Sequence, residues 1–382
     1  METRLRQLYQ QHFSGEPILV RSPGRINLIG EHTDYNMGFV LPAAVQQAAY
    51  IALGPRSDDQ IHLYAADFGE SHRTTLSGLQ PSAARWPDYL CGVAAMLRRR
   101  GMPLRGFQAV LTSDIPIGSG MSSSAAVECA VLFALNEAFG LELDRLDMVR
   151  IAQEAENEFV GVRCGIMDQF ASMMGRAGSV IRLDCRSLAY EYLPFGDPDF
   201  QLVLFDSGVK HSLAETEYNV RRAECEQGVR LLQRHDPAVR SLRDASVDLV
   251  TRLLADAPGR IFDRCLYVTQ EIQRLNQACE DLRRGDLSAF GQKMFATHDG
   301  LSRLYEVSCP ELDFLVDAVR EDPAVLGSRL MGGGFGGCTI NLVRTQAVEE
   351  LCGRVGTWYR ERFGRPLPAY PCRLSPGTSR LG

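Results

Sequence analysis

The stretch Pro116-Ile-Gly-Ser-Gly-Met-Ser-Ser-Ser-Ala-Ala126 joins two contrasting sequence patterns. The residues before it, Phe107-Gln-Ala-Val-Leu-Thr, are short, partly alternating and rich in β-formers, and they predict a strand. After it, apolar residues recur at spacings of three and four from Val127 to Ala138, which predicts a half-buried helix. Gly140 is a suitable end for that helix. The stretch is therefore predicted to be a glycine-rich turn that leads from a strand into a helix.

A turn of this kind presents unpaired backbone N–H groups and the positive end of a helix dipole, and so favours an anion such as phosphate. It is not a Walker P-loop, because the Gly-x4-Gly-Lys-Ser/Thr pattern is missing and the turn contains no lysine. A serine that merely caps an ordinary helix explains this stretch equally well when it is taken alone.

The composition is that of a soluble globular protein. The 382 residues suggest two domains, and 45% of them are hydrophobic and 23% charged. The formal net charge of -6 disfavours a nucleic-acid or membrane-surface partner. The chain has no run of about twenty apolar residues that would span a bilayer. Its first residues, Met-Glu-Thr-Arg-Leu-Arg-Gln, contain no apolar signal region.

The eleven cysteines are scattered and include no C-x-x-C pair, which argues against a disulfide framework or a zinc site. We expect reduced thiols in a cytoplasmic protein.

The order of patterns along the chain predicts an α/β (α+β) fold with two lobes. Short strands are expected at 40–44, 50–53 and 60–64, a glutamate-rich helix at 144–162, and a strand at 179–184. The turn formers Pro194-Phe-Gly-Asp-Pro-Asp favour a domain boundary, so the predicted domains are 1–197 and 198–382. Beyond it we expect a strand at 201–206, long helices from about 214 to 318, and a glycine turn entering a strand at 330–343.

The segment Gly24-Arg-Ile-Asn-Leu-Ile-Gly-Glu-His-Thr-Asp-Tyr35 mixes apolar residues with many ionisable ones. A core strand would hold fewer polar groups, and a flexible loop would not need the apolar residues. A strand or turn that lines a polar cavity accounts for both.

Residues 24–35, 116–126 and 332–337 occur in the order of the three motifs of the GHMP small-molecule kinases, which this chain resembles. Residues 24–35 are similar to the more specific galactokinase motif. The resemblance to that family extends to four further segments and covers roughly residues 18 to 345. These segments are Cys164-Gly-Ile-Met-Asp-Gln-Phe, Asp184-Cys-Arg-Ser-Leu, Tyr218-Asn-Val-Arg-Arg-Ala-Glu-Cys-Glu and Tyr305-Glu-Val-Ser-Cys-Pro-Glu-Leu-Asp.

The resemblance implies a GHMP kinase fold, with a ribosomal-protein-S5-like N-terminal domain, a ferredoxin-like C-terminal domain and an active site between them. The sequence departs from the family at two positions. Met331 stands where relatives usually carry threonine, and Met37 replaces a residue that is usually small. We expect Met331 to alter contacts near the phosphates or the sugar C1, and Met37 to reshape the pocket rim.

The implied activity is transfer of the γ-phosphoryl group of ATP to the C1 hydroxyl of α-D-galactose, the first phosphorylation step of galactose catabolism. Asp168 would accept the proton of that hydroxyl or orient it, and the sequence leaves the two roles open. Arg25 would lie beside Asp168 and stabilise the transferring group. Taken without the family, Asp168 reads as a surface turn aspartate.

The resemblance also implies binding positions for ATP and Mg²⁺. Hydroxyl and carboxylate oxygens suit Mg²⁺, and the family match assigns them to Ser124 and Glu156. Spacing alone does not distinguish Glu156 from Glu154 and Glu158. Trp86 matches a position near adenine, although core packing explains a tryptophan equally well. The nucleotide-binding positions are Gly118, Ser119, Gly120, Met121, Ser122, Ser123, Ser124, Ala125 and Trp86.

Five positions match the galactose-binding positions of the family in addition to Asp168, namely Glu31, His32, Asp34, Gly165 and Tyr218. Asp34 would read the C3 and C4 hydroxyls, and Glu31 and His32 would lie towards C6. The expected partners are therefore galactose and ATP, and the expected state is a monomer or weak dimer.

Two alternatives remain at this level. One keeps the fold and changes the sugar to N-acetylgalactosamine, galacturonate or arabinose, although Glu31 near C6 disfavours a uronate. The other is a non-catalytic sensor of galactose and ATP, which the intact Ser122-Ser-Ser-Ala-Ala and the presence of Asp168 disfavour.

Overall fold

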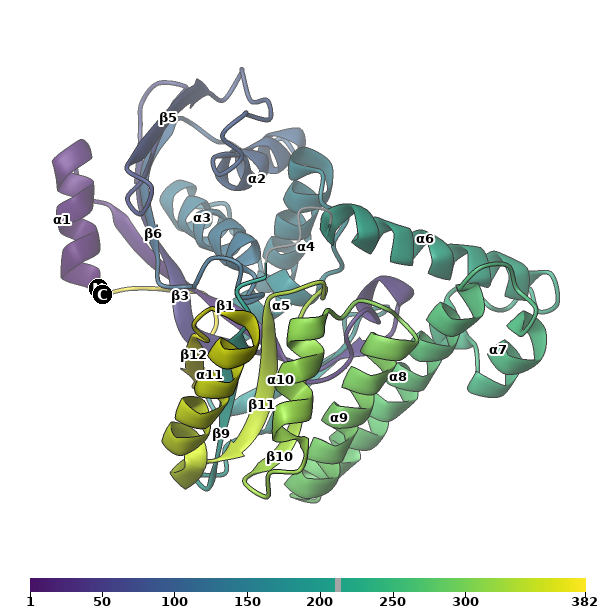
Figure 1. The fold of residues 1–382 in the computed structure, drawn as a ribbon. Helices are drawn as coiled ribbons and strands as arrows, with labels where there is room; N and C mark the ends of the chain where they lie inside the picture. Colours follow the sequence, from purple (N-terminus) through teal and green to yellow (C-terminus); the bar gives the residue numbers. More distant parts are fainter. Residues whose placement is uncertain (210–213) are drawn as a thin grey trace.

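The structure is a computed structural model that describes residues 1–209 and 214–382 (Figure 1). Most helices of the described chain pack on two β-sheets, and a third, smaller sheet has three strands. The predicted mixed α/β (α+β) class is confirmed.

The first sheet has six strands, of which β4 and β6 are parallel neighbours and the other pairs are antiparallel. In spatial order they are β13 (Ser379–Arg380), β1 (Ile18–Asn27), β3 (Pro42–Pro55), β6 (Phe107–Ser113), β4 (Gln60–Ala65) and β5 (Glu70–Thr75).

Strand β3 corrects the prediction of two short strands at 40–44 and 50–53, because one strand runs unbroken from Pro42 to Pro55. The polar pair Gln46 and Gln47 interrupts the apolar pattern and misleads a sequence-based prediction. In the fold, Gln46 is paired with the C-terminal segment: its N–H donates to the Arg373 carbonyl over 3.0 Å. A partner far along the chain thus completes this strand.

Helices cover both faces of the first sheet, because its strands alternate in the direction of their side chains. Leu19 and Val110 pack against α1, whereas Val20 and Leu111 face the main core. The helices are α1 (Glu2–His12) on one face and α2 (Asp88–Arg99), α3 (Ser123–Phe139), α4 (Arg145–Ala155) and α5 (Met167–Met174) on the other. As predicted, the turn at 116–122 leads from β6 into α3, and Gly140 ends α3 with a left-handed φ of 60°.

The second sheet has four antiparallel strands: β10 (Val325–Leu330), β11 (Cys338–Arg344), β9 (Phe200–Asp206) and β12 (Ala369–Cys372). Val203 and Phe205 pack against α9 (Leu287–Arg303), α10 (Pro310–Arg320) and α11 (Val348–Phe363). The alternate residues Leu202 and Leu204 belong to the same buried core as the first sheet. One core therefore connects the two sheets.

The remaining elements are a group of helices, a third sheet and short turns. A separate helical group, which projects at the right of Figure 1, consists of α6 (Ala214–Gln233), α7 (Val247–Leu254) and part of α8 (Ile261–Arg283). The third sheet pairs β2 (Phe39–Val40) with β7 (Ser179–Asp184) and β7 with β8 (Tyr190–Pro194). The short turns are η1 (Asp34–Asn36), η2 (Glu156–Val160), η3 (Leu242–Asp244) and η4 (Thr345–Ala347).

The chain crosses between the two sheets more than once. The second sheet begins at β9, close to the predicted boundary at 197, but the last strand, β13, pairs with β1 in the first sheet. The C-terminal Gly382 lies near Glu2. The division into 1–197 and 198–382 stays a prediction, and the closing residues of the second segment lie with the first sheet.

All eleven cysteines lie in the described residues and carry free thiols. Within those residues, no helix combines the length and the apolar character needed to cross a membrane.

Candidate active site

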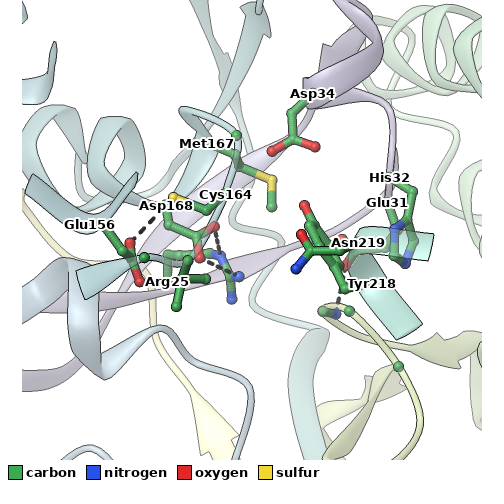
Figure 2. Close-up of a pocket in the computed structure, with 16 residues that line it drawn as sticks. Arg25, Glu31, His32, Asp34, Glu156, Cys164, Met167, Asp168, Tyr218 and Asn219 are labelled. Atoms are coloured by element: carbon green, nitrogen blue, oxygen red, sulfur yellow. Dashed lines mark hydrogen bonds and ion pairs between the residues drawn. The ribbon is translucent and has the colours of Figure 1, made fainter. Parts of the chain in front are cut away.

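A cavity of ≈ 330 Å³ opens where the end of β1, the turn before α5, the start of α6 and a glycine loop meet (Figure 2). It brings together the predicted sugar-binding and catalytic residues and Glu156 from segments far apart in the sequence. Its lining consists of Arg25, Glu31, His32, Asp34, Glu156, Gly161, Val162, Cys164, Gly165, Met167, Asp168, Tyr218, Asn219, Gly332, Gly333 and Gly334.

Asp168 and Arg25 form an ion pair in the wall of this cavity. Asp168 lies in the first turn of α5, and Arg25 is a nearly buried residue of β1. The guanidinium donates from Nε to Oδ1 over 2.8 Å and from Nη2 to Oδ2 over 2.9 Å. Such a two-point pair fixes the plane of the carboxylate as well as its position. The predicted proximity of Arg25 and Asp168 is thus present in the structure.

The phosphate-loop candidate lies against this pair. Arg25 Nη1 donates to the Gly120 carbonyl, and the hydroxyl of Ser122 donates to Asp168 Oδ2. Ser122 occupies the N-cap position of α3, yet its side chain makes no capping hydrogen bond. The alternative of a serine that merely caps the helix therefore does not describe this turn. The first N–H groups of α3 are left for a ligand, as an anion site requires.

Glu156 is the inward member of a row of three glutamates. The prediction of one helix over 144–162 is wrong in detail, because α4 ends at Ala155 and a π turn follows from Glu156 to Val160. Glu154 pairs with Arg100 and Glu158 with Arg99 at the surface, whereas Glu156 is 6% exposed. The tertiary structure thus separates glutamates that spacing alone did not.

The Glu156 carboxylate lies beside the start of α3. It lies near the hydroxyl of Ser124 and accepts from Gln169 Nε2 over 2.6 Å. Burial, reinforced by the negative charge of Asp168, raises the pKa of Glu156 to about 7. A cation at this point would favour the ionised carboxylate.

Few other groups are available there to a metal ion. Within residues 1–209 and 214–382, no three His, Cys, Asp or Glu side chains are grouped as a metal cage. Ser124 and Glu156 would supply one hydroxyl and one carboxylate oxygen. Mg²⁺ accepts such a sparse protein donor set, because it usually keeps waters and binds substrate phosphates.

Asp34 and Gly165 are in close contact on the opposite wall. A Cβ atom at position 165 would lie 1.7 Å from Asp34 Oδ2, so only glycine fits beside this carboxylate. Burial, with the charge of Asp168 added, raises the pKa of Asp34 to about 7. The carboxylate is aimed into the cavity (Figure 2).

Glu31 ties the first motif to the third. Its Oε1 accepts from the Gly332 N–H over 2.8 Å and from Arg329 Nη2 over 3.0 Å. Arg329 is fully buried and also donates to the carbonyls of Asn27, Leu28 and Leu330.

His32 and Tyr218 form the aromatic side of the cavity. Their ring centroids lie 5.5 Å apart, and His32 Nδ1 is 2.7 Å from the Tyr35 hydroxyl. Burial lowers the pKa of His32 to about 3, so the ring is neutral at physiological pH. A neutral imidazole can donate one hydrogen bond and accept another, which suits a hydroxylated ligand.

The predicted nucleotide-binding residues Gly118–Ala125 lie outside the cavity lining, as do Trp86, Met331 and Met37. Trp86 packs half-buried against the core, and its Nε1 donates to Glu70 Oε2 over 2.8 Å. Met331 is buried with its methyl group near Gly120, so it contacts the phosphate loop. Met37 is 43% exposed and borders a neighbouring cavity. Their expected effects on ligand contacts stay predictions.

Sequence reasoning missed Arg329, Gln169 and Tyr305. Arg329 directly precedes the third motif, Gln169 follows Asp168, and Tyr305 begins one of the family-like segments. Their places in or beside the family-like segments were the signal in the sequence that could have identified them. Their partners, however, lie up to several hundred residues away.

Three protein-family models match this chain. GHMP kinases N terminal domain matches residues 88–176, GHMP kinases C terminal matches 278–361, and the Galactokinase galactose-binding signature matches 7–55. The last of these contains four of the cavity residues, Arg25, Glu31, His32 and Asp34.

Curated relatives match over nearly their whole length. A galactokinase of Roseiflexus sp. is 40% identical over 378 residues, which is 99% of this chain and 96% of the relative. A galactokinase of Thermotoga maritima is 39% identical and covers 95% of this chain and 99% of its own.

Solved structures place the fold in the same group. The Lactococcus lactis galactokinase complexed with galactose superposes with a TM-score of 0.96 at 33% identity, with full coverage of both chains. A mevalonate kinase has a TM-score of 0.65 at 18% identity, covers 94% of this chain and 99% of its own, and shows the shared fold alone. With family models at both ends of the chain and relatives matched over their whole length, this chain belongs to the galactokinase family of the GHMP kinases.

Proposed function

We propose that this protein transfers the γ-phosphoryl group of ATP to the C1 hydroxyl of α-D-galactose and releases galactose 1-phosphate and ADP. One observation carries the proposal: a single cavity joins the Asp168–Arg25 pair to the galactokinase-like motif, and Ser122 at the start of α3 donates to the same Asp168. The relative from Lactococcus lactis, whose structure holds galactose, supports the choice of sugar.

At the sugar end, we assign hydroxyl recognition to Glu31, His32, Asp34, Gly165 and Tyr218. Asp34 accepts from the C3 and C4 hydroxyls, and Glu31 and His32 lie towards C6. A site that hydrogen bonds a particular hydroxyl rejects sugars without it, because its own buried polar groups would be left unpaired. Asp34 is therefore the residue we expect to separate galactose from glucose.

At the phosphate end, residues Gly118–Ala125 offer backbone N–H groups and the start of α3 to ATP. Asp168 orients the C1 hydroxyl and accepts its proton as the new bond forms. Arg25 holds Asp168 and stabilises the negative charge on the transferring group. The Ser122 hydroxyl, by donating to Asp168, links the nucleotide loop to the reacting carboxylate.

Ser124 and Glu156 are the residues we assign to Mg²⁺. When bound with ATP, the ion would neutralise phosphate charge, a task for which this loop has no lysine. The buried carboxylate of Glu156, with a hydroxyl beside it, fits that role.

The remaining assignments concern the adenine, the cellular location and the oligomeric state. We assign Trp86, whose side chain is half-buried, to stacking on the adenine of ATP. We also propose a cytoplasmic enzyme that works as a monomer or weak dimer without nucleic-acid or membrane partners. Its eleven free thiols and mildly acidic composition support this assignment.

The test is ADP release with Mg-ATP over galactose, glucose, N-acetylgalactosamine, galacturonate and arabinose. We expect turnover with galactose and little with glucose. Turnover with another sugar in place of galactose would keep the kinase and overturn the assigned specificity. Binding of galactose without turnover of any sugar would favour a sensor of galactose and ATP.

A further inference from the structure

The turn between α9 and α10, residues Tyr305 to Val307, contacts the galactokinase-like motif, α6 and the glycine loop. The Tyr305 side chain reaches the galactokinase-like motif, the main-chain carbonyls reach α6, and the Val307 carbonyl accepts from the Phe335 N–H of the glycine loop. Tyr305 itself is fully buried and absent from the cavity lining. It can therefore affect a ligand only through its neighbours.

A chain of polar groups connects Tyr305 to His32. The Cys225 thiol lies 3.2 Å from the Tyr305 hydroxyl, that hydroxyl lies 2.8 Å from the Tyr35 hydroxyl, and Tyr35 lies 2.7 Å from His32 Nδ1. The rings of His32 and Tyr305 are 4.7 Å apart, so they also pack together. The orientation of His32 is thus held by contacts on two sides.

One assignment of the protons uses every group of this chain. Each hydroxyl has one proton to donate, and a neutral imidazole carries its proton on one nitrogen. His32 Nε2 is buried without a hydrogen-bond partner among the described residues, whereas Nδ1 is paired with the Tyr35 hydroxyl. An order in which Cys225 donates to Tyr305, Tyr305 to Tyr35 and Tyr35 to Nδ1 satisfies all three contacts and leaves the His32 proton on Nε2. The chain therefore selects the tautomer that presents an N–H donor at the cavity.

A second connection runs through the main chain of the same turn. Arg221 Nε donates to the Tyr305 carbonyl over 2.8 Å, and Nη2 donates to the Glu306 carbonyl over 3.0 Å. Arg221 follows Tyr218 by three residues on α6, almost one helical turn. Its hold on the turn therefore sets the distance between Tyr218 and the rest of the cavity.

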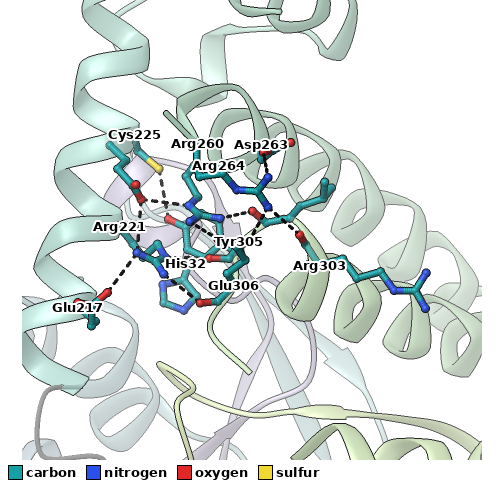
Figure 3. Close-up of polar contacts among 12 residues, drawn as sticks. His32, Glu217, Arg221, Cys225, Arg260, Asp263, Arg264, Arg303, Tyr305 and Glu306 are labelled. Atoms are coloured by element: carbon teal, nitrogen blue, oxygen red, sulfur yellow. Dashed lines mark hydrogen bonds and ion pairs between the residues drawn. The ribbon is translucent and has the colours of Figure 1, made fainter. Parts of the chain in front are cut away.

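The turn is held from its far side by α8. Arg264 donates to the Leu304 carbonyl and, over 2.7 Å, to the Glu306 carboxylate, which Arg260 also contacts at 2.6 Å (Figure 3). Glu306 has a left-handed φ of 53°, a conformation that non-glycine residues adopt only when the surroundings hold them. Tyr305 is therefore fixed in place before any ligand arrives.

We propose that Tyr305 is a positioning residue for sugar binding, which fixes the tautomer and orientation of His32 through Tyr35 and the placement of Tyr218 through Arg221. The inference rests on the proposed function only in naming galactose as the ligand. Tyr305 is expected to set affinity for the sugar and to leave the nucleotide site and the phosphoryl-transfer step unchanged.

The test is Tyr305→Phe, which keeps the ring and removes the hydroxyl. We expect the galactose KM, and the galactose Kd measured by calorimetry without nucleotide, to rise about five-fold, the effect of one lost buried hydrogen bond. The KM for ATP and kcat should change less than about two-fold, because uniform sugar binding is lost and transition-state stabilisation is kept. Tyr35→Phe should act alike, and the double variant should be little worse than either, because a chain is broken only once.

Tyr9→Phe is the matched control. Tyr9 is equally buried, its hydroxyl accepts from Gln108 Nε2 over 2.8 Å, and it lies on α1 in a separate cluster. It should lower the melting temperature without changing the galactose KM. Arg221→Lys, which keeps the charge but loses the two-carbonyl contact, should raise the galactose KM as Tyr305→Phe does.

An unchanged galactose KM and Kd in folded Tyr305→Phe would overturn the inference, as would fully additive effects of Tyr35→Phe and Tyr305→Phe. Should Tyr305→Phe fail to fold, Tyr35→Phe decides, because it breaks the same chain one link nearer to His32. Failure of the proposed function would appear in the wild type as binding without turnover. Calorimetry would still test the positioning role in that case.

Discussion

Four carboxylates share one cavity, and their neighbours give each a different character. Arginines hold Asp168 and Glu31 directly. Burial, with the charge of Asp168 added, raises the pKa of Asp34 and that of Glu156 to about 7. Sugar hydroxyls and a metal ion favour the ionised form of a carboxylate. We therefore expect Asp34 and Glu156 to be fully ionised only when both ligands are bound.

Asp168→Asn tests the residue assigned to the C1 hydroxyl. The amide keeps the shape of the carboxylate but has no charge and accepts no proton, so we expect turnover to fall about 10²- to 10⁴-fold. ATP binding should stay nearly unchanged in calorimetry, since the loop at 118–125 is intact. Loss of nucleotide binding in a folded variant would show that Asp168 serves ATP instead.

Asp34→Asn should separate stability from function. The folded pKa of Asp34, about 7, lies above its usual 3.8, so the stability associated with its proton is present at low pH and lost as the pH rises through 7. Asn avoids that cost, and we expect the melting temperature at about pH 8 to rise by roughly 2 °C, as for a gain of about 1 kcal/mol.

The gain in melting temperature should shrink as the pH is lowered towards about 5, while galactose turnover is strongly reduced at every pH. Differential scanning fluorimetry across this range measures the first effect, and ADP release the second. A gain that does not depend on pH would contradict the assigned titration of Asp34.

At the scale of elements, the π turn after α4 decides which glutamate reaches the cavity. In a regular helix, side chains at i and i+2 point about 200° apart, so neither Glu154 nor Glu158 lies on the same face as Glu156. The five-residue π turn widens the helix end at that point, as π-bulges at functional sites often do. Glu156 is thereby placed beside Ser124 of α3.

Glu156→Gln should raise the Mg²⁺ concentration needed for half-maximal activity. Changes to outer-shell partners alone cost about ten-fold in metal affinity, and loss of a ligand should cost at least as much. The galactose KM at saturating Mg²⁺ should change little. The measurement is ADP release over a magnesium titration at fixed galactose and ATP.

Glu154→Gln is the control for this variant, because Glu154 pairs with Arg100 outside the cavity. A surface ion pair contributes little, so its magnesium curve should match that of the wild type. Coincident curves for Glu156→Gln and Glu154→Gln would remove Glu156 from the metal site.

At the scale of the whole molecule, the C-terminus belongs to the sheet that carries Arg25. Strand β13 pairs with β1, and the fully buried Thr378 lies 2.8 Å from the Ser22 hydroxyl of the same strand. Tail residues also bond Val45 and Gln46 on β3. Residues 373–380 therefore complete the sheet that contains β1.

Truncation after Arg373 should destabilise the N-terminal sheet more than the C-terminal one. Several buried hydrogen bonds are lost at about 1 kcal/mol each, and β1 becomes an exposed edge. We expect a lower melting temperature, weaker galactose binding and first proteolytic cuts within residues 1–197, identified by mass spectrometry. A chain that lacks only the exposed Gly382 serves as the control, and first cuts in the second sheet would contradict the prediction.

Much of the fold could be predicted from local patterns. The turn at 116–122 into α3, the strand β9 and the run of helices from α6 to α10 were all predicted, because each depends on periodicity and on glycine within the segment itself. Strand β3 was predicted as two pieces and β5 was not predicted at all. β5 reads Glu-Ser-His-Arg-Thr-Thr, a polar edge strand with little apolar pattern.

For the site, the sequence alone determined the family-like motifs, the residue types of the cavity and hence the class of reaction. The tertiary structure decided which of three glutamates turns inward, that Ser122 bonds Asp168 and does not cap α3, and that Tyr305 and Arg329 contact the galactokinase-like motif at Tyr35 and Glu31. The physical reason is range. Helix periodicity and turn chemistry act over a few residues, whereas burial, ion pairing and a closed cavity arise from groups that only folding brings together.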